Sequence, residues 1–504
     1  MKPRSLVLVT VDCLRADHVG FLGYSKPVTP FLDSLAETSA VFADAIVAGA
    51  PTYFSFPAIL ASRYPLAFGR DVMGIAPNEP TITSALKDAG FQTGAFVAGN
   101  PYLSSRFGYN QGFDTFHDFL DSIPEGQRSP GGNTPESAFN RFVQASASHN
   151  NLTAAAYEEL YFWYCRWRSA AENVSMDALR RYPAADAVVD QACAWLNGLA
   201  REPFFLWLHL MDPHHPYYPP EDASSALKAK ISARRARFLN SFWNRGHVAN
   251  RRLERYREEV ISLYDAGIYW VDKQISRLVS AMKQSQLWDN LVFAVTADHG
   301  EEFLEHGVRY HSPTSLSEQL IHVPLLLHAR TLSSQRRVQT PFSLLHLAPT
   351  LLDAVGLPAP VSFQGRSFWP QIVTGELPNE LAIVECVEAC TNPFRRDDRM
   401  RPRLMAVRDD SYKLVINFRE KTERLYDLKN DPGERAALPP GDLPSEHARL
   451  LLVAREHLQK TRHKQNVDMR LRSRLRELQQ SAELRRLCSE GSELRLYSTP
   501  QALD

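Results

Sequence analysis

Several short hydrophobic runs in the chain end at charged residues. Residues 5–12 read SLVLVTVD, residues 203–212 read PFFLWLHLMD and residues 291–298 read LVFAVTAD. Runs of this length that are rich in Val, Leu and Phe are typical of strands covered on both faces. We therefore predict three buried strands, of which the first and third deliver Asp12 and Asp298 at their carboxyl ends.

Helical patterns alternate with these strands. Residues 81–90, TITSALKDAG, predict a helix that Gly90 closes, and residues 91–100, FQTGAFVAGN, predict a further strand. Residues 29–42, TPFLDSLAETSAVF, are expected to form one helix. The alternation predicts an α/β fold, a mostly parallel sheet with helices on both faces. The run 258–282 places one apolar stripe on a long helix, formed by Val260, Tyr264, Ile268, Val271, Ile275 and Leu278.

The two strand-end aspartates are candidate metal ligands. In open α/β sheets, ligands bind outside the carboxyl ends of the strands, and His299 follows Asp298 directly. Each Asp could instead cap a following helix. Two such residues with an imidazole beside one of them favour a divalent ion, and this ligand set suits Mg, Ca or Mn, with Zn as a further option.

A third informative stretch is AGAPTYFSFPAILASRYP, residues 48–65. Pro51, Thr52 and the apolar run that follows predict a turn into a helix. A hydroxyl at a helix N-terminus lies at the positive end of the helix dipole, and a metal touching the same oxygen would lower its pKa further. The alternative is that Thr52 only caps its helix.

Composition narrows the class of protein. A chain of 504 residues should hold one large domain and something smaller. Basic and acidic residues number 57 each, so no general attraction to nucleic acid or to an acidic membrane is expected. Cys386 and Cys390 are interpreted as buried thiols rather than a zinc pair. No hydrophobic run is long enough for a signal peptide or a membrane span, which predicts a cytoplasmic protein.

Nine sequence pieces, in order over roughly residues 5–440, carry a resemblance to a known family. They include VTVDCLRADHVGFLGY, GFDTF, FFLWLHLMDPHHPYYPP, LWDNLVFAVTADHGEEFLEHG and SLLHLAPTLLDAVGLP. In these pieces the chain resembles the sulfatase family of the alkaline phosphatase superfamily. The resemblance implies that Asp12, Asp298 and His299 hold a metal at the carboxyl edge of an alkaline phosphatase-like sheet, with the nucleophile at Thr52.

The chain also departs from the sulfatase pattern. Family members carry a Cys or Ser that is converted to formylglycine, an aldehyde that the side chain of Thr52 cannot form. The usual Asp-Asp pair is Asp12-Cys13, which removes one oxygen ligand. A family lysine falls near Ala98, leaving Asn100 nearby, and a second family lysine is replaced by His311.

A threonine with a histidine in these places is similar to phosphoethanolamine transferases, lipoteichoic acid synthases and nucleotide pyrophosphatases. That resemblance implies a metal-activated threonine and a covalent phospho-enzyme. His214 and His311 would then bind the anionic oxygens of the substrate or a second metal, with His209 and His215 as alternatives to His214. Asn100 could donate a hydrogen bond to a substrate oxygen.

The remaining segments are assigned more coarsely. We expect a catalytic domain over residues 1–374, an antiparallel-sheet subdomain over 375–440 and a helical tail over 441–504. The tail helices could dock on the main domain or pair with a second subunit; one predicted stripe holds Leu471, Leu475, Leu478 and Ala482. The arginine-rich segment 227–257 is interpreted as a solvated helical face rather than a basic lid. The acidic residues Glu301, Glu302 and Glu305 are likewise expected on a solvated helix face.

Together these features predict a metal-dependent hydrolase acting on an anionic ester of a small molecule, glycan or lipid. Phosphoric or phosphonic esters are favoured because Thr52 occupies the nucleophile position. The alternatives are a sulfuric ester hydrolase, a phospho-group transferase and a catalytically idle binding protein.

Overall fold

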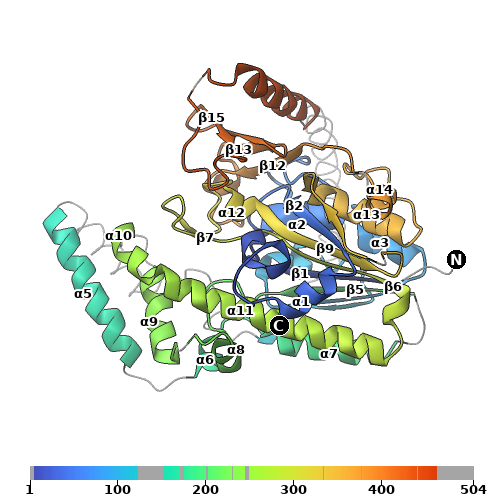
Figure 1. Cartoon of the computed structure of the whole chain (residues 1–504), viewed down its shortest axis with the longest axis horizontal. Coiled ribbons are helices and arrows are strands. Elements are labelled where there is room, and N and C mark those ends of the chain that lie inside the picture. Colours follow the sequence, from blue (N-terminus) through green and yellow to red (C-terminus); the bar gives the residue numbers. More distant parts are fainter. Residues whose placement is uncertain are drawn as a thin grey trace, which may run out of the picture.

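A computed structural model describes most of the chain (Figure 1). The described residues are 5–122, 151–170, 175–199, 203–229, 231–244, 249–332, 334–375, 377–439 and 441–461. None of the helices described in these ranges combines the length and the apolar character that crossing a bilayer requires.

The main body is built around a mostly parallel sheet. Within the described residues its strand order is β10-β2-β9-β6-β1-β5-β3-β4, with β11 joining the edge of β2. β9 runs antiparallel to both of its neighbours, and the other pairings are parallel. The predicted α/β class is therefore confirmed. The strands are β1 Ser5–Val11, β2 Ala40–Ile46, β3 Gln92–Val97, β4 Thr115–His117, β5 Phe204–Leu210, β6 Leu291–Ala297, β9 His322–Ala329, β10 Arg336–Val338 and β11 Phe342–Ser343.

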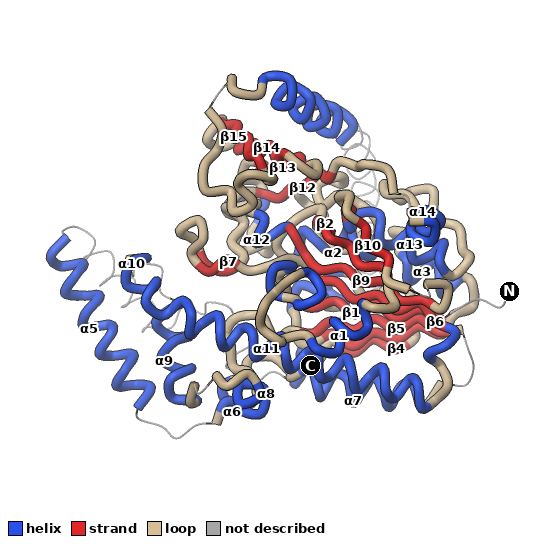
Figure 2. Tube along the Cα trace, in the orientation of Figure 1, coloured by secondary structure: helices blue, strands red, loops and turns tan. Residues whose placement is uncertain are grey.

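Helices cover the sheet in two groups (Figures 1 and 2). The first group packs together around the long α11, whose predicted apolar stripe is buried throughout. The second group packs around α13, which contacts α2, α3 and α14. The first comprises α1 Pro30–Ala36, α7 Ala185–Asn197, α8 Glu221–Ala226 and α11 Arg257–Gln284; the second comprises α2 Thr52–Ala61, α3 Ile82–Asp88, α13 Leu347–Ala354 and α14 Trp369–Thr374.

The expectation of one helix over residues 29–42 is wrong in its second half. α1 ends at Ala36, and β2 begins at Ala40. Residues Ala40, Val41 and Phe42 pair with β9 on one side and with β10 on the other. Apolar residues that are buried on both faces fit a strand as well as a helix, and these sheet partners are distant in sequence.

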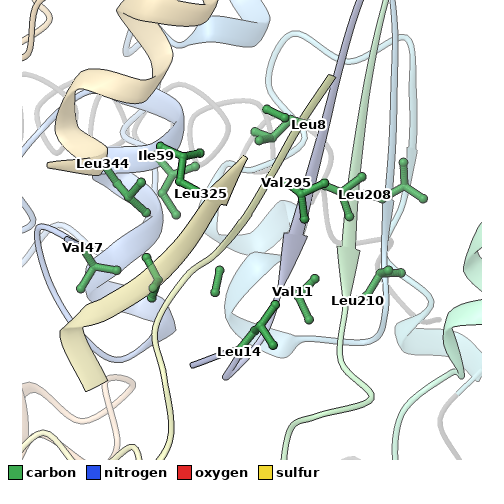
Figure 3. Packing of buried hydrophobic residues seen from close by; sticks show 14 of the residues in the cluster. Leu8, Val11, Leu14, Val47, Ile59, Leu208, Leu210, Val295, Leu325 and Leu344 are labelled. Carbon is green, nitrogen blue, oxygen red and sulfur yellow. The ribbon is translucent and has the colours of Figure 1, made fainter. Parts of the chain in front are cut away.

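The hydrophobic core joins the sheet to the α2 group. Figure 3 shows Leu8 of β1, Leu208 of β5, Val295 of β6, Leu325 of β9 and Ile59 of α2 in one cluster. These side chains are at most 2% exposed. The core therefore fixes the strands whose carboxyl ends carry the candidate site.

A second, smaller sheet follows in the chain. Its strands pair antiparallel in sequence order, as predicted for this region. A helix over residues 444–461 buries Leu450 and Ala454 against this small sheet, whereas the docking considered from the sequence was on the main domain. The predicted stripe at 471–482 lies outside the described residues. The strands are β12 Ala382–Val387, β13 Arg403–Arg408, β14 Tyr412–Asn417 and β15 Thr422–Asp427, with the short α15 Arg396–Arg399 between the first two.

A helical arm extends from the main body (Figure 1). It contains α5 Asn151–Ala170, α9 Ala233–Trp243 and α10 Asn250–Leu253, and the short α6 Met176–Leu179 packs on α9. The aromatic residues of the arginine-rich segment, Phe238, Phe242 and Trp243, are buried rather than exposed. Only part of this segment is therefore a solvated face.

Candidate active site

Two neighbouring strands place the predicted aspartates side by side. β1 and β6 are parallel, with Val11 next to Ala297. The residues that follow, Asp12 and Asp298, therefore leave the same edge of the sheet, and both are fully buried. The strand β5 lies on the other side of β1, and the Asp12 N–H donates to the Leu210 carbonyl at 2.8 Å. The expected meeting of the two carboxylates is thus present in the fold.

His299 turns its Nε2 atom towards both carboxylates. Nε2 lies 3.8 Å from Asp12 Oδ1 and 3.5 Å from Asp298 Oδ2. The other ring nitrogen, Nδ1, lies 2.9 Å from the Gly300 carbonyl, which can accept only if Nδ1 carries the proton. This hydrogen bond leaves the lone pair of Nε2 facing the two aspartates and Thr52.

Thr52 is the first residue of α2. Its Oγ1 atom lies 3.0 Å from His299 Nε2, and its side chain is 3% exposed. Pro51 occupies the N-cap position, and no side chain caps this helix. The alternative in which Thr52 serves as the helix cap is therefore wrong. The hydroxyl instead points into the cluster formed by His299 and the two aspartates.

Two further side chains hold Asp12. The amide of Asn100, just beyond β3, donates to Asp12 Oδ2 at 3.0 Å, and His209 Nε2 lies 3.2 Å from the same oxygen. His209 is fully buried, and its Nδ1 is 3.0 Å from Thr10 Oγ1. Sequence reasoning considered His209 only as a substitute for His214. A lone imidazole inside an otherwise apolar strand was the signal for this additional role.

His214 and His311 meet above the cluster. Their ring centroids are 4.8 Å apart, and the ring of His311 is 4.7 Å from that of His299. His311 Nδ1 lies 3.1 Å from Glu301 Oε1, and the Tyr217 hydroxyl donates to Glu301 Oε2 at 3.1 Å. The structure therefore brings both predicted histidines to the site and adds a buried carboxylate behind one of them.

The expectation that the acidic residues after His299 form a solvated helix face is wrong. Glu301 and Glu302 are fully buried, and Glu302 belongs to the short strand β7 Glu302–Phe303, which pairs with β8 Arg309–Tyr310. Glu305 accepts from the Arg15 guanidinium at 2.6 Å. Their partners come from distant segments, so the local charge pattern could not reveal their burial.

The surroundings of the site shift the pKa values of its two aspartates in opposite directions. Burial acts to raise the pKa of Asp12, but the nearby His214, His209 and His299 hold that pKa well below its usual range. Burial and the neighbouring Asp12 raise the pKa of Asp298.

The pKa values of His214 and His311 are also shifted in opposite directions. Burial lowers the pKa of His214 to about 4. Burial also acts to lower the pKa of His311, but Glu301 outweighs it and raises the pKa of His311 above its usual value. The surroundings therefore favour the neutral form of the His214 imidazole and the cationic form of the His311 imidazole.

The ligand atoms of Asp12, Asp298 and His299 lie within 4.8 Å of one another and can hold a metal ion. One buried atom in this group, Asp298 Oδ2, has no hydrogen-bond partner. Two carboxylates and an imidazole around such an atom fit a divalent cation. Cys13 forms two further groups of this size, one with His299 and His311 and one with Asp12 and His214, and each group shares a ligand with the first.

A pocket opens beside His214. Its lining includes Arg180, Arg181, Tyr182 and Tyr218. The lining also includes Asp212, and Arg180 donates to the Tyr218 carbonyl at 2.9 Å and pairs with Asp177 at 3.2 Å. The two arginines therefore place basic groups beside the buried cluster, partly offset by these carboxylates.

Comparison with known proteins gives the family. Residues 4–357 match the family described as Sulfatase, and residues 305–464 match the one described as N-sulphoglucosamine sulphohydrolase, C-terminal. The chain belongs to the sulfatase family.

Curated relatives include uncharacterized sulfatase YidJ of Escherichia coli strain K12. It is 23% identical over 461 residues, which span 86% of this chain and 82% of that protein. Arylsulfatase K of Xenopus laevis is 25% identical over 277 residues, spanning 49% of this chain and 50% of the relative. Arylsulfatase K of Canis lupus familiaris is 30% identical over 113 residues, only 22% of this chain and 21% of the relative.

Solved structures share the fold at low identity. A protein bound to its substrate D-glucosamine-2-N,6-O-disulfate matches with a TM-score of 0.66 at 16% identity, covering 92% of this chain and 99% of that chain. The phosphonate monoester hydrolase of Agrobacterium radiobacter matches with a TM-score of 0.62 at 18% identity, covering 92% and 96%. The family supports the prediction of an ester hydrolase, and these neighbours show that the fold is shared.

Proposed function

We propose that this chain is a metal-dependent hydrolase of phosphoric or phosphonic esters, with Thr52 as the nucleophile. The carrying observation is the position of the Thr52 hydroxyl, 3.0 Å from His299 Nε2 and beside two fully buried aspartates. A divalent cation held by Asp12, Asp298 and His299 would supply positive charge for an attacking oxygen and for the oxygens of the ester.

The other side chains have separate roles in this proposal. Asn100 and His209 keep Asp12 oriented through their hydrogen bonds to Oδ2. The amide of Asn100 is thereby committed to Asp12, which favours a positioning role over direct contact with the substrate. His214 and the guanidinium groups of Arg180 and Arg181 would bind the anionic oxygens.

The covalent step is a displacement at phosphorus. The Thr52 hydroxyl loses its proton to solvent, and its oxygen forms a bond to phosphorus while the bond to the leaving oxygen breaks. His311, cationic beside Glu301, gives its proton to that leaving oxygen. Water then attacks the phospho-threonine, and His311 takes the proton from this water. Cleavage of the bond to Thr52 releases the phosphate or phosphonate, and the Thr52 oxygen takes up a proton from solvent, which restores the hydroxyl.

A sulfuric ester is the second candidate substrate. The match of residues 305–464 to the N-sulphoglucosamine sulphohydrolase C-terminal family favours it. Phosphorus is preferred because the threonine at position 52 cannot be converted to the formylglycine on which the sulfatase resemblance depends.

The test compares Thr52 with its neighbour Ser55, a buried hydroxyl that bonds to the Thr52 carbonyl. Thr52→Ala should lower kcat by several orders of magnitude, whereas Ser55→Ala should change it far less. Rapid quenching with a phosphate or phosphonate ester, followed by peptide mass spectrometry, should find the transferred group on Thr52. Retention of most activity by Thr52→Ala would exclude the nucleophile, and faster turnover of sulfate esters would exclude the preference for phosphorus.

A further inference from the structure

Four large hydrophobic side chains are exposed on one face of α5. The exposed fractions are 71% for Leu160, 55% for Trp163, 44% for Tyr164 and 68% for Trp167. Their spacing of three and four residues places them on the same side of the helix. Scattered exposed hydrophobic residues are common, but a contiguous aromatic face on one helix marks an interaction surface.

The opposite face of α5 is fixed to the arm. Tyr161 and Cys165 are buried, and the Phe162 ring packs against Phe238 and Phe242 of α9 with centroid distances of 5.6 Å. Glu159 pairs with Arg252 at 2.7 Å. These contacts hold the helix in one orientation, with its aromatic face directed away from α9.

We propose that this aromatic face, formed by Leu160, Trp163, Tyr164 and Trp167, binds the surface of a phospholipid bilayer. Trp and Tyr concentrate at membrane interfaces because their rings are apolar while their N–H and O–H groups stay hydrated. Arg166 adds a cation at this face, with its guanidinium carbon 5.3 Å from the Trp163 ring centroid. This combination suits the headgroup region of an anionic bilayer.

The size of the face argues against a second copy of the chain as the occupant. At about 200 Å² for each large side chain, these exposed fractions correspond to an area on the order of 500 Å². A stable dimer buries about 800 Å² on each partner. Four side chains can, however, insert into a bilayer interface, where each contributes independently.

The arm is connected to the candidate active site. Arg309 donates to the Trp243 carbonyl at the end of α9, and the Asn250 amide of α10 donates to the Gly307 carbonyl at 2.7 Å. Both contacts are made by the segment that leads to His311. If the proposed hydrolase function holds, docking would place the site close to esters carried by lipids, but binding to the bilayer itself does not depend on that function.

The test uses the full chain and vesicles of equal parts phosphatidylcholine and phosphatidylglycerol. The wild-type protein should sediment with the vesicles, and the double variant Trp163→Ser/Trp167→Ser should bind at least roughly tenfold more weakly. The matched control is Leu452→Ser, which removes a 58% exposed leucine from the helix over 444–461 and should leave binding unchanged. Thermal unfolding of all three proteins shows whether the variants remain folded.

Two results would overturn the proposal. One is wild-type protein that stays in the supernatant, or a double variant that sediments as well as the wild type does. The other is a concentration-dependent dimer, seen by sedimentation velocity without vesicles and lost in the double variant, with no binding to lipid. Quenching of tryptophan emission by brominated lipid in the wild type, but not in the double variant, would place these two indoles in the bilayer.

Discussion

Two buried groups of acidic side chains in this protein are balanced in different ways. Between the main sheet and the small sheet, the fully buried Lys413 lies 3.0 Å from Glu318 and 2.5 Å from Glu434. Arg408 adds bonds to Glu318 and to Asp44. In the described part of the chain, the ion-pair partners of Asp12 and Asp298 are histidines alone.

The difference indicates what the site requires. A buried carboxylate is costly unless a cation or several hydrogen-bond donors compensate for its charge. The first group, formed by Glu318, Glu434, Asp44 and their basic partners, contains its own cations and is structural. The second group, formed by Asp12 and Asp298, is paired with imidazoles rather than with lysine or arginine. We therefore propose that a bound divalent ion compensates for its charge.

The largest effect on stability is expected from removing a cation from the first group. Lys413→Met would leave Glu434 buried without its cation and should destabilise the fold by about 3–5 kcal/mol. Chemical denaturation measures this cost. Lys429→Met is the control, since Lys429 is 63% exposed and its pair with Asp410 should contribute less than about 1 kcal/mol. Equal small losses in both variants would remove the contrast between the two groups.

The second prediction concerns the histidines above the aspartates. His311→Ala and His214→Ala should each lower kcat by roughly 10²-fold while the fold stays intact, because the first loses the proposed proton transfer and the second loses stabilisation of the anionic oxygens. His328→Ala is the matched control, since His328 stacks on Trp288 at the other end of the sheet. A normal kcat with a lowered melting temperature would assign both histidines a structural role.

The third prediction is that one substitution stabilises the protein without metal and destabilises it with metal. Asp298→Asn removes one of two neighbouring buried charges, so in a chelating buffer it should stabilise the metal-free protein. With metal present the same variant should be less stable than the wild type, because the metal stabilises the fold by binding. Unfolding curves in both buffers measure the two effects. Destabilisation of equal size in both buffers would contradict the account.

The fourth prediction is a pH dependence rather than a single loss, and it concerns Glu302, a fully buried acid with no ion pair in the described part of the chain. Burial raises its pKa to about 8 from an ordinary value of 4.5, so the folded protein keeps a proton that the unfolded chain releases between these values. The free energy of unfolding should therefore fall as pH rises through that window, by about 1 kcal/mol per pH unit. Glu302→Gln cannot ionise and should remove this slope, which denaturation at several pH values would show. An unchanged slope would mean that Glu302 is ionised in the fold.

Sequence patterns predicted the sheet and the placement of the strand-end aspartates well, because a buried strand and the residue that follows it are local signals. SLVLVTVD and LVFAVTAD each contain both the strand and the aspartate that follows its carboxyl end. The roles of Glu301 and His209 were not found in this way. Glu301 bonds to Tyr217 and His311, and His209 bonds to Asp12, and each of these contacts depends on how distant strands are placed. A charge run on its own does not distinguish a solvated face from a buried network.

The most direct test is the divalent metal content of the purified protein after dialysis against a mixture of Mg, Ca, Mn and Zn salts. The wild type should retain about one tightly held ion per chain, and Asp12→Ala and Asp298→Ala should each lose it. Asp272→Asn serves as the control, since this buried acid accepts the Phe31 and Leu32 N–H groups far from the site and should leave the metal in place. Full metal occupancy in both alanine variants, or a wild type that retains no metal, would contradict the assignment.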